Sequence, residues 1–586
     1  MRNSLVKNLG KLWKDRKVAK VQNKDYDVKK LFMFKAVLDC FLCCPILLMS
    51  FTVMLSKNAA GQKESSLHYT FAKKDKTSIV VTVRFVNNRE STMPLLLPGE
   101  WAGQDSLYKC ISNIKAVTEQ TGIASTNRPD SFIVKTIKGK ETVIEYTLQQ
   151  DWDGVIAYPI YFRPIITDSI FFISGNAGLV YPVLSDTVLN CSITYKNFSS
   201  ADYYGNSFFV NKTSGSFKAT IANLKNAVYF AGNMRAKDFF IQGSKITVVM
   251  AGNYTFDSDS LYAVTTKIIA AERKFWKDTA HPPFVITILP VTSATSGGTA
   301  YHNSFAVFYN PKFKINQGLQ YLLAHEYFHT WLGQKMQQSQ PEEAGKWFIE
   351  GFTDYYTYIT LKDLGLISEQ EYLNAVNDVF IKYYRSNFSD ADNAVIQAKY
   401  FTDGQVKQLA YNRGHIIAIL INGILQKQQT GETLDDCVRN FYTGAKNPRI
   451  FSDTAFFRQL LHYAGESTMK LVQEILNGNN ERIVTNLYSR EYHIDSIQLT
   501  LFEMGFDFAE SRKQKKVVGL IAGSAAEQAG LENGLPLTGS FSFSNGTPDR
   551  LAKIGVIKNN INTVLEYYPA RKVNRYAPRF KMKLKT

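Results

Sequence analysis

The sequence HEYFH is the part of this chain best suited to bind a metal ion. Its two histidines, His325 and His329, are four positions apart, so on a helix both imidazoles lie on one face. That spacing suits the chelation of one tetrahedral cation, and imidazole nitrogens favour zinc over calcium or magnesium. Glu326 can lie over the metal without being a ligand, where it can take a proton from a metal-bound water. The motif therefore predicts a zinc site with its own general base.

A third ligand would distinguish a metal site from a chance motif, and Glu350 is the candidate. It lies 21 residues beyond His329 in the segment KWFIEGFTDYYTYI, on the next predicted helix. Pro341 and Gly345 in the intervening loop allow that helix to turn back antiparallel. Asp354, four residues after Glu350, lies on the same helical face, where its carboxylate can accept the outer N–H of a ligand histidine. We expect three zinc ligands, one of them oriented by Asp354.

The alternative is that both histidines are ordinary surface or core residues and that Glu350 is solvated. Apolar residues beside the two segments disfavour it, because they would bury both helices: Leu322, Leu323, Phe328, Trp331, Trp347, Phe348 and Phe352. A carboxylate buried in such surroundings needs a partner. The metal interpretation supplies that partner.

Hydrophobic periodicity places these residues on helices of an α-rich region. Helical spacing is present in the three segments that carry the site, 317–335, 342–364 and 406–426, and also at 258–277, 368–385, 453–463 and 468–477. A strand is predicted at 283–291. Residues 66–235 instead contain β-branched or alternating runs, at 78–86, 142–148 and 178–184, separated by Gly, Asn, Asp and Pro. The last hundred residues return to short strands around a glycine-rich turn at 523–534.

The net charge of +17 is concentrated at the two ends of the 586-residue chain. Residues 1–35 carry a net charge of +8 and residues 512–586 a net charge of +10, whereas residues 36–511 have 43 basic and 44 acidic residues. A nearly neutral body with basic ends is not typical of a nucleic-acid groove. We therefore expect no nucleic-acid partner. The basic C-terminal segment either keeps a small domain solvated or favours an anionic membrane surface.

An apolar stretch, AVLDCFLCCPILLMSFTVML, covers residues 36–55 behind the basic N-terminus. Twenty residues are just long enough to span a bilayer, and the flanks are typical of a signal peptide or an uncleaved anchor. A buried core helix is the alternative. We expect the body to be exported, either periplasmic or membrane-anchored with its catalytic domain on the non-cytoplasmic side. Met33 is a candidate true start, with a small-residue cleavage site near Ala59–Ala60.

The cysteines do not indicate a thiolate metal cluster, because none is in a CxxC pair outside the leader. The six are Cys40, Cys43, Cys44, Cys110, Cys191 and Cys437. Export would permit a disulfide between Cys110 and Cys191, but the sequence leaves that pairing open.

The segments HEYFH, WFIEGFTDYY and LAYNRGHIIAILI resemble the glycyl aminopeptidase family of gluzincin zinc metallopeptidases, which are relatives of aminopeptidase N. The resemblance implies one zinc ion per chain, with His325, His329 and Glu350 as ligands and Glu326 as general base. It also implies that Tyr411 donates a hydrogen bond to the tetrahedral intermediate. A phenol, with a pKa of about 10, stays protonated at neutral pH and can stabilise an oxyanion. The alternative for Tyr411 is an ordinary aromatic residue opening a helix.

One motif departs from the family pattern. In the aminopeptidases, a glycine-rich edge strand ahead of the HExxH helix carries a Glu that binds the free amine of the substrate. Here Gly297 and Gly298 of SGGTAYHNSFAVFY correspond to the glycines, but no Glu follows before the helix, and His302 and Asn303 lie nearby. The strand can still pair with a substrate backbone. Aminopeptidase action is therefore a family expectation, and endopeptidase action stays open.

The resemblance also implies the domain organisation of a multidomain α+β protein. We expect a leader over residues 1–60, a β-sandwich-like N-terminal domain over 61–240, a thermolysin-like, mostly α catalytic domain over 241–490 and a small PDZ-like β domain over 491–586. In the last domain, GSAAEQAGL resembles the turn and helix of PDZ domains, and Met504, Gly505 and Phe506 weakly match the carboxylate-binding loop. Such a domain would bind a C-terminal peptide; the alternative is a domain used for packing only.

The sequence thus predicts hydrolysis of a peptide or protein by water that the metal and Glu326 activate, with Tyr411 stabilising the oxyanion. Two alternatives remain. One is a non-catalytic, exported peptide-binding protein with a degenerate peptidase domain, and the other is hydrolysis of a small non-peptide substrate in the same site. Oligomeric state and cleavage preference cannot be inferred from these patterns.

Overall fold

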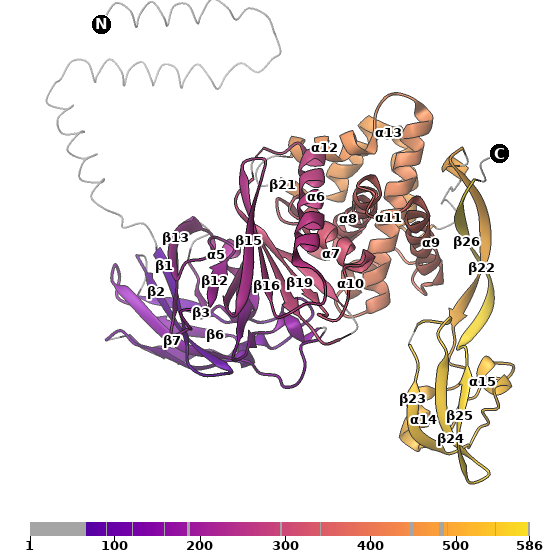
Figure 1. Ribbon diagram of the computed structural model, residues 1–586, viewed down its shortest axis with the longest axis horizontal. Coiled ribbons are helices and arrows are strands. Elements are labelled where there is room, and N and C mark those ends of the chain that lie inside the picture. Colours follow the sequence, from indigo (N-terminus) through magenta and orange to yellow (C-terminus); the bar gives the residue numbers. More distant parts are fainter. Residues whose placement is uncertain are drawn as a thin grey trace, which may run out of the picture. The chain divides into compact units, whose positions relative to one another are not determined.

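The computed structural model describes residues 66–583 except 89–90, 120, 158, 185–187, 280, 294–295, 340, 446–448, 480–485, 489 and 545 (Figure 1). The predicted leader, its apolar segment at 36–55 and the candidate start at Met33 lie outside these residues. In the part of the chain that is described, no helix combines the length and the apolar character needed to cross a membrane. Membrane attachment and export therefore stay predictions.

The first part of the described chain is β-rich, as predicted. A six-stranded sheet has the order β13 (Ser214–Ala219), β11 (Leu189–Lys196), β1 (Ser66–Lys73), β2 (Ser78–Val86), β7 (Glu141–Gln149) and β4 (Ile111–Ala116). A second sheet has the order β10 (Tyr181–Pro182), β3 (Thr92–Leu96), β6 (Ser131–Lys135) and β5 (Ile123–Ser125). A third has the order β12 (Tyr203–Asn206), β14 (Val228–Gly232), β9 (Ile170–Ser174) and β8 (Ile165–Ile166). Alternate residues of β1 and its neighbours pack with residues of the other two sheets in one core, so all three sheets belong to one folded body.

The next sheet carries one wall of the candidate site. Its order is β15 (Met234–Ile241), β16 (Ser244–Ala251), β17 (Phe284–Pro290), β19 (Ser304–Tyr309) and β18 (Gly297–Tyr301). β16, β17 and β19 are parallel, whereas the edge strand β18 runs antiparallel to β19. One face of this sheet packs on helices and the other on the β-rich region. Burial on both faces explains why the predicted strand at 283–291 is apolar apart from Thr287.

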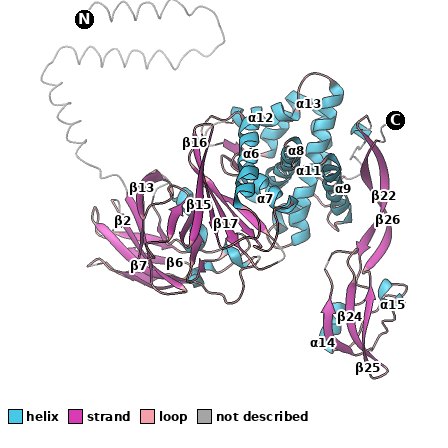
Figure 2. Ribbon diagram, in the orientation of Figure 1, coloured by secondary structure: helices cyan, strands magenta, loops and turns pink. Residues whose placement is uncertain are grey.

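Helices lie on one face of this sheet, some against its strands and others against neighbouring helices (Figure 2). They are α6 (Ser258–Trp276), α7 (Gln317–Phe328), α8 (Lys346–Asp363), α9 (Glu369–Arg385), α10 (Asn393–Lys399), α11 (Gly404–Gln428), α12 (Leu434–Gly444) and α13 (Asp453–Leu476). The contact of α8 with α11 is close, because a Cβ on Gly351 would lie 2.4 Å from the Gly414 Cα atom, and one on Gly414 would lie 1.7 Å from the Trp347 carbonyl oxygen. Glu350 is next to Gly351, and Tyr411 lies within one turn of Gly414. The close approach of the two backbones therefore brings Glu350 and Tyr411 together.

Some of the helices differ from the prediction and others agree with it. The helix predicted to reach residue 335 ends at Phe328, because the chain turns at Gly333, whose φ of 118° suits glycine. The two helices predicted at 453–463 and 468–477 are both present, as the two parts of α13 on either side of a break at Gly465, whose φ is 81°. The helices α10 and α12 were not predicted.

The last part of the chain forms a two-stranded ribbon and a three-stranded sheet. β22 (Tyr492–Phe502) pairs with β26 (Ala570–Met582), and the sheet has the order β23 (Leu537–Ser542), β24 (Ala552–Lys558) and β25 (Ile561–Tyr567). The turn at Gly505 (φ 83°) leads into the short helix α14 (Phe508–Gln514), and the Ile521 N–H donates to the Gly505 carbonyl oxygen at 2.8 Å. The PDZ type stays a prediction, because this arrangement alone does not identify it.

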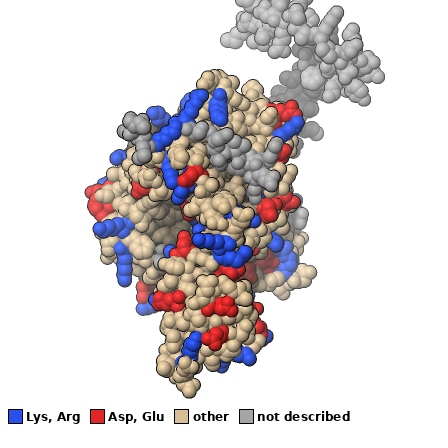
Figure 3. All heavy atoms as spheres, turned by 90° about the vertical axis from the view of Figure 1, so that its right-hand side faces the viewer, with Lys and Arg blue, Asp and Glu red and all other residues tan. Residues whose placement is uncertain are grey.

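Two further features are the state of the described cysteines and the distribution of charge on one face of the surface. Cys110, Cys191 and Cys437 are buried free thiols, so the disulfide that the sequence left open between Cys110 and Cys191 is not present. Lys and Arg side chains are interspersed with Asp and Glu on the face shown in Figure 3.

Glu272 of α6 is a carboxyl group that destabilises the fold at neutral pH. It is fully buried, and within the described part of the chain neither side-chain oxygen has a hydrogen-bond partner. Burial raises the pKa of Glu272 well above the ordinary value of 4.5. The folded state therefore holds this proton more tightly than the unfolded state. Stability is lost as the pH rises from about 4.5 toward the folded-state pKa.

We expect Glu272→Gln to stabilise the protein by about 1–2 kcal/mol at pH 8 and by less at pH 5, because glutamine has no charge to bury. Chemical unfolding of variant and parent at both pH values measures the difference. An equal effect at pH 5 and pH 8 would show that ionisation of Glu272 is not the cause.

Candidate metal centre and active site

Three ligand atoms converge between α7 and α8. His325 Nε2 lies 3.1 Å from His329 Nε2, and Glu350 Oε2 lies 3.6 Å from the first and 3.3 Å from the second. Ligand atoms of a tetrahedral zinc site, each about 2.0–2.1 Å from the ion, are separated by about 3.3 Å. All three side chains are largely buried, with at most 9% of each residue exposed. The donor set and its spacing therefore fit zinc.

The hydrogen bonds of the two histidines engage Nδ1 of each ring and leave Nε2 available to bind a metal. His329 Nδ1 lies 2.9 Å from the Leu332 carbonyl oxygen, which can only accept, so Nδ1 carries the proton and Nε2 has the lone pair. His325 Nδ1 lies 3.2 Å from the Tyr321 hydroxyl oxygen. Because Tyr321 donates its own proton to Asp354, its oxygen accepts from His325 Nδ1. Both Nε2 atoms are thus free to bind a metal.

Asp354 does not accept a hydrogen bond directly from a ligand histidine, although the sequence suggested that it would. The predicted direct bond from a ligand histidine is replaced by a relay through Tyr321, whose hydroxyl lies between His325 and Asp354. The other carboxylate oxygen accepts from His415 Nδ1 of α11 at 2.7 Å. Burial opposes ionisation of Asp354, but these hydrogen bonds, chiefly that of His415, outweigh it and lower its pKa. Asp354 therefore orients the first ligand through a tyrosine and ties α8 to α11.

Glu326 lies against the edge strand β18 and is not one of the converging ligands. A Cβ atom on Gly298 would lie 2.7 Å from Glu326 Cγ and 2.8 Å from its Oε1, so only glycine fits at this position without displacing the carboxylate. Burial raises the pKa of Glu326, the charge of Glu350 adds to the effect, and the two histidines oppose it. A raised pKa suits a carboxylate that must accept a proton and then release it.

Two phenols stand beside Glu350. The ring of Tyr411 from α11 stacks on His325 with centroids 5.9 Å apart, and the Tyr400 hydroxyl donates to Glu350 Oε1 at 3.5 Å. Burial, followed by the Glu350 charge, raises the pKa of Tyr411 well above 10, so its phenol stays protonated and can donate. The sequence did not indicate Tyr400, because it follows a helix of only seven residues and belongs to no motif.

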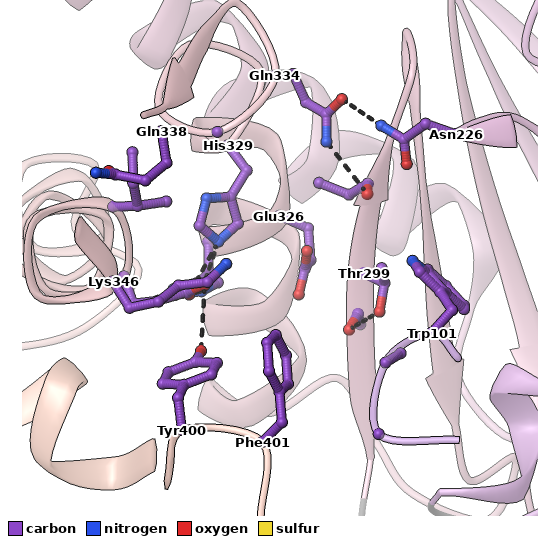
Figure 4. Close-up of a pocket in the computed structure, with 18 of the residues that line it drawn as sticks. Trp101, Asn226, Thr299, Glu326, His329, Gln334, Gln338, Lys346, Tyr400 and Phe401 are labelled. Carbon is purple, nitrogen blue, oxygen red and sulfur yellow. Dashed lines mark hydrogen bonds and ion pairs between the residues drawn. The ribbon is translucent and has the colours of Figure 1, made fainter. Parts of the chain in front are cut away.

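A pocket of about 620 Å³ contains these groups (Figure 4). Its helical wall includes His329, Lys346 and Tyr400, and the wall across from it includes Thr299 of β18 and Trp101 of the β-rich region. Of the residues predicted for the site, those that line it are His325, Glu326, His329, Glu350, Tyr411 and Gly298.

The remaining predicted residues near β18 lie elsewhere. Gly297 faces the β-rich region, where a Cβ atom would lie 2.0 Å from the Tyr161 hydroxyl oxygen. His302 and Asn303 line a separate, smaller cavity, in which His302 Nδ1 lies 3.1 Å from Asn223 Nδ2. Burial lowers the pKa of His302 to about 4. These two residues do not take the place of the missing glutamate.

Helices that bring three such ligands to one point, beside a buried carboxylate, supply the metal ligands and the base that a metallopeptidase requires. Residues 319–402 match the model of the M61 glycyl aminopeptidase family, and this segment contains all three candidate ligands and Glu326. The match agrees with the family resemblance of the motifs, and the chain is a metallopeptidase. Tyr411 lies beyond the matched segment.

Solved structures with similar folds include an aminopeptidase N family protein from Idiomarina loihiensis. It matches with a TM-score of 0.69 at 15% identity, over 88% of this chain and 98% of the other. An M1 zinc metallopeptidase from Deinococcus radiodurans matches with a TM-score of 0.47 at 13% identity, over 71% of this chain and 93% of the other. The likeness to the first of these two structures establishes the fold of this chain. Among curated proteins, none matches the sequence significantly.

Proposed function

We propose that the protein is a zinc-dependent peptide hydrolase whose single zinc ion is held by His325, His329 and Glu350. The observation that carries the proposal is the convergence of these three ligand atoms, 3.1–3.6 Å apart, in a pocket that also holds Glu326. Zinc bound there would polarise a peptide carbonyl and lower the pKa of a water molecule.

Residues of the chain would carry out proton transfer, stabilise the oxyanion and align the substrate. Glu326 accepts a proton from the attacking water as its oxygen bonds to the carbonyl carbon, and passes that proton to the leaving nitrogen as the C–N bond breaks. Tyr411 donates a hydrogen bond to the carbonyl oxygen as negative charge develops on it. The edge strand β18 aligns the substrate by pairing with its backbone, since one of its edges is not covered by another strand of the sheet.

The test is to load the purified protein with zinc, measure its metal content and expose it to a peptide library. We expect one zinc per chain and hydrolysis that stops when a chelator removes the metal and returns when zinc is restored. Zinc content of one per chain without cleavage of any peptide would support the rival, a non-catalytic binding protein. Cleavage of small non-peptide esters or amides alone would support the other alternative.

The family resemblance favours an aminopeptidase, whereas the missing glutamate on β18 leaves endopeptidase action open. Comparing each library peptide with a free and an acetylated N-terminus separates the two, because an aminopeptidase requires the free amine. The proposals that the body is exported and that the C-terminal domain binds peptide C-termini rest on sequence patterns alone. Neither affects the chemistry of the zinc site.

A further inference from the structure

Two lysine side chains line the pocket beside the metal ligands. Lys346 is the first residue of α8, one turn before Glu350, and its Nζ lies 3.7 Å from Glu350 Oε1. Lys407 lies one turn before Tyr411 on α11. The two ammonium groups lie 5.5 and 6.0 Å from the centroid of the Tyr400 ring. Together they form a cationic cluster on the helical wall of the pocket.

The pocket has no matching acidic cluster. Among its described lining residues, the carboxylates are Glu326 and Glu350, and both already have roles as base and ligand. The wall across from Lys346 is neutral, with Thr299, Trp101 and Asn226 (Figure 4). A bound zinc ion would add further positive charge. A substrate carboxylate that reaches the two lysines would therefore meet opposite charge.

Lys407 is the cation better placed to meet a substrate. Lys346 is paired with Glu350, and only 13% of its side chain is exposed. Lys407 is half-buried, and no carboxylate of the described residues forms an ion pair with it. It lines the same pocket as Glu326, where the reaction would occur. A half-buried ammonium in a low-dielectric pocket is stabilised when an anion binds to it.

We infer that Lys407, supported by Lys346, forms a carboxylate subsite, so that the enzyme prefers peptides with an acidic group next to the scissile bond. This specificity rests on the proposed peptide hydrolysis. The acidic group is either an Asp or Glu side chain or the C-terminal carboxylate, because both present the same chemistry. Charge-assisted hydrogen bonds from an ammonium distinguish a carboxylate from an amide of the same shape.

The experiment compares peptides that differ only in this group, using the zinc-loaded full chain. One arm exchanges Glu for Gln and Asp for Asn on each side of the cleaved bond. The other arm exchanges a free C-terminus for an amide. We expect kcat/KM to be about tenfold to hundredfold higher for the carboxylate member of one arm, the size expected for a hydrogen bond to a charged group. The arm that responds identifies the source of the carboxylate.

Lys407→Met removes the charge and keeps an unbranched apolar stem. We expect it to abolish the preference while the amide peptide is still cleaved, and we expect Lys407→Arg to retain most of the preference. The ratio of the two peptides isolates recognition from any general effect of the Lys407 charge on Glu326. The matched control is Lys427→Met, which makes the same change at an exposed position in the last turn of α11 and should keep the preference.

Two outcomes overturn the inference without touching the proposed function: equal cleavage of carboxylate and amide peptides, or a preference that Lys407→Met leaves intact. Failure of the zinc-loaded protein to cleave any peptide would overturn the proposed function and this inference together.

Discussion

Replacing Glu326 with glutamine is expected to remove nearly all peptide hydrolysis and to leave zinc bound. Glutamine has almost the same shape, but its amide cannot accept the proton of the attacking water. Loss of a general base lowers kcat by about 10²- to 10⁴-fold. Because Glu326 is not one of the three converging ligands, metal content should stay at the parent value. Turnover of the best library peptide and zinc content, measured on the same samples, test both parts.

Glu350→Gln is the matched control for Glu326, since it makes the same chemical change in the same pocket at a ligand position. We expect this variant to lose zinc as well as activity, because a neutral amide is a poor ligand. Substantial hydrolysis by Glu326→Gln would remove Glu326 from the proposed role. Loss of zinc from both variants would mean that Glu326 takes part in binding the metal.

The metal ligands could be predicted because their arrangement is largely local. The spacing of His325 and His329 on a helix determines that both side chains face the same way. Glu350 comes from another helix, but the apolar residues around both segments indicated that the two helices are buried together. The closeness of α8 to α11, which brings Tyr411 into the pocket, depends on Gly351 and Gly414. No periodicity reveals such a contact, and Tyr411 was identified only by resemblance.

Residues that depend on tertiary packing could not be predicted. Tyr400, Lys346 and Lys407 line the pocket because three helices converge there, and their sequence neighbours give no sign of it. Asp354 was placed on the correct helical face, but an interposed Tyr321 changes its contact with the ligand. Side-chain length on a neighbouring turn decides such contacts, and a spacing rule does not include it.

In the fold, too, features with a local sequence pattern could be predicted, whereas features that depend on single residues or short segments could not. Long amphipathic helices and alternating strands were found near their predicted positions, because each carries its own periodic signal. The end of α7 was missed, since one positive φ angle at Gly333 redirects a chain whose composition still suits a helix. The short α10 was missed because seven residues are too few to show a helical period.

Gly298→Ala is expected to lower activity by about a hundredfold without unfolding the protein or releasing zinc. The added Cβ atom would lie 2.7–3.0 Å from Cγ, Oε1 and Cδ of Glu326, too close for ordinary contact. Because Glu326 is a flexible side chain, it should move away from the new methyl group, and β18 should keep its place. A displacement of about 1 Å at a catalytic group can cost about 10²-fold in rate. Activity, zinc content and Tm are the measurements.

Gly122→Ala serves as the control, because no heavy atom lies within 4 Å of the Cβ atom that it would add. It should leave activity unchanged, which shows that a lost glycine as such has no effect. Full activity of Gly298→Ala would mean that Glu326 can work from a displaced position, or that the edge strand yields instead. A crystal structure of the zinc-loaded variant distinguishes these two results, since only the second moves the backbone of β18. Gly298→Ala tests whether the position of Glu326 matters, whereas Glu326→Gln tests only whether its carboxylate matters.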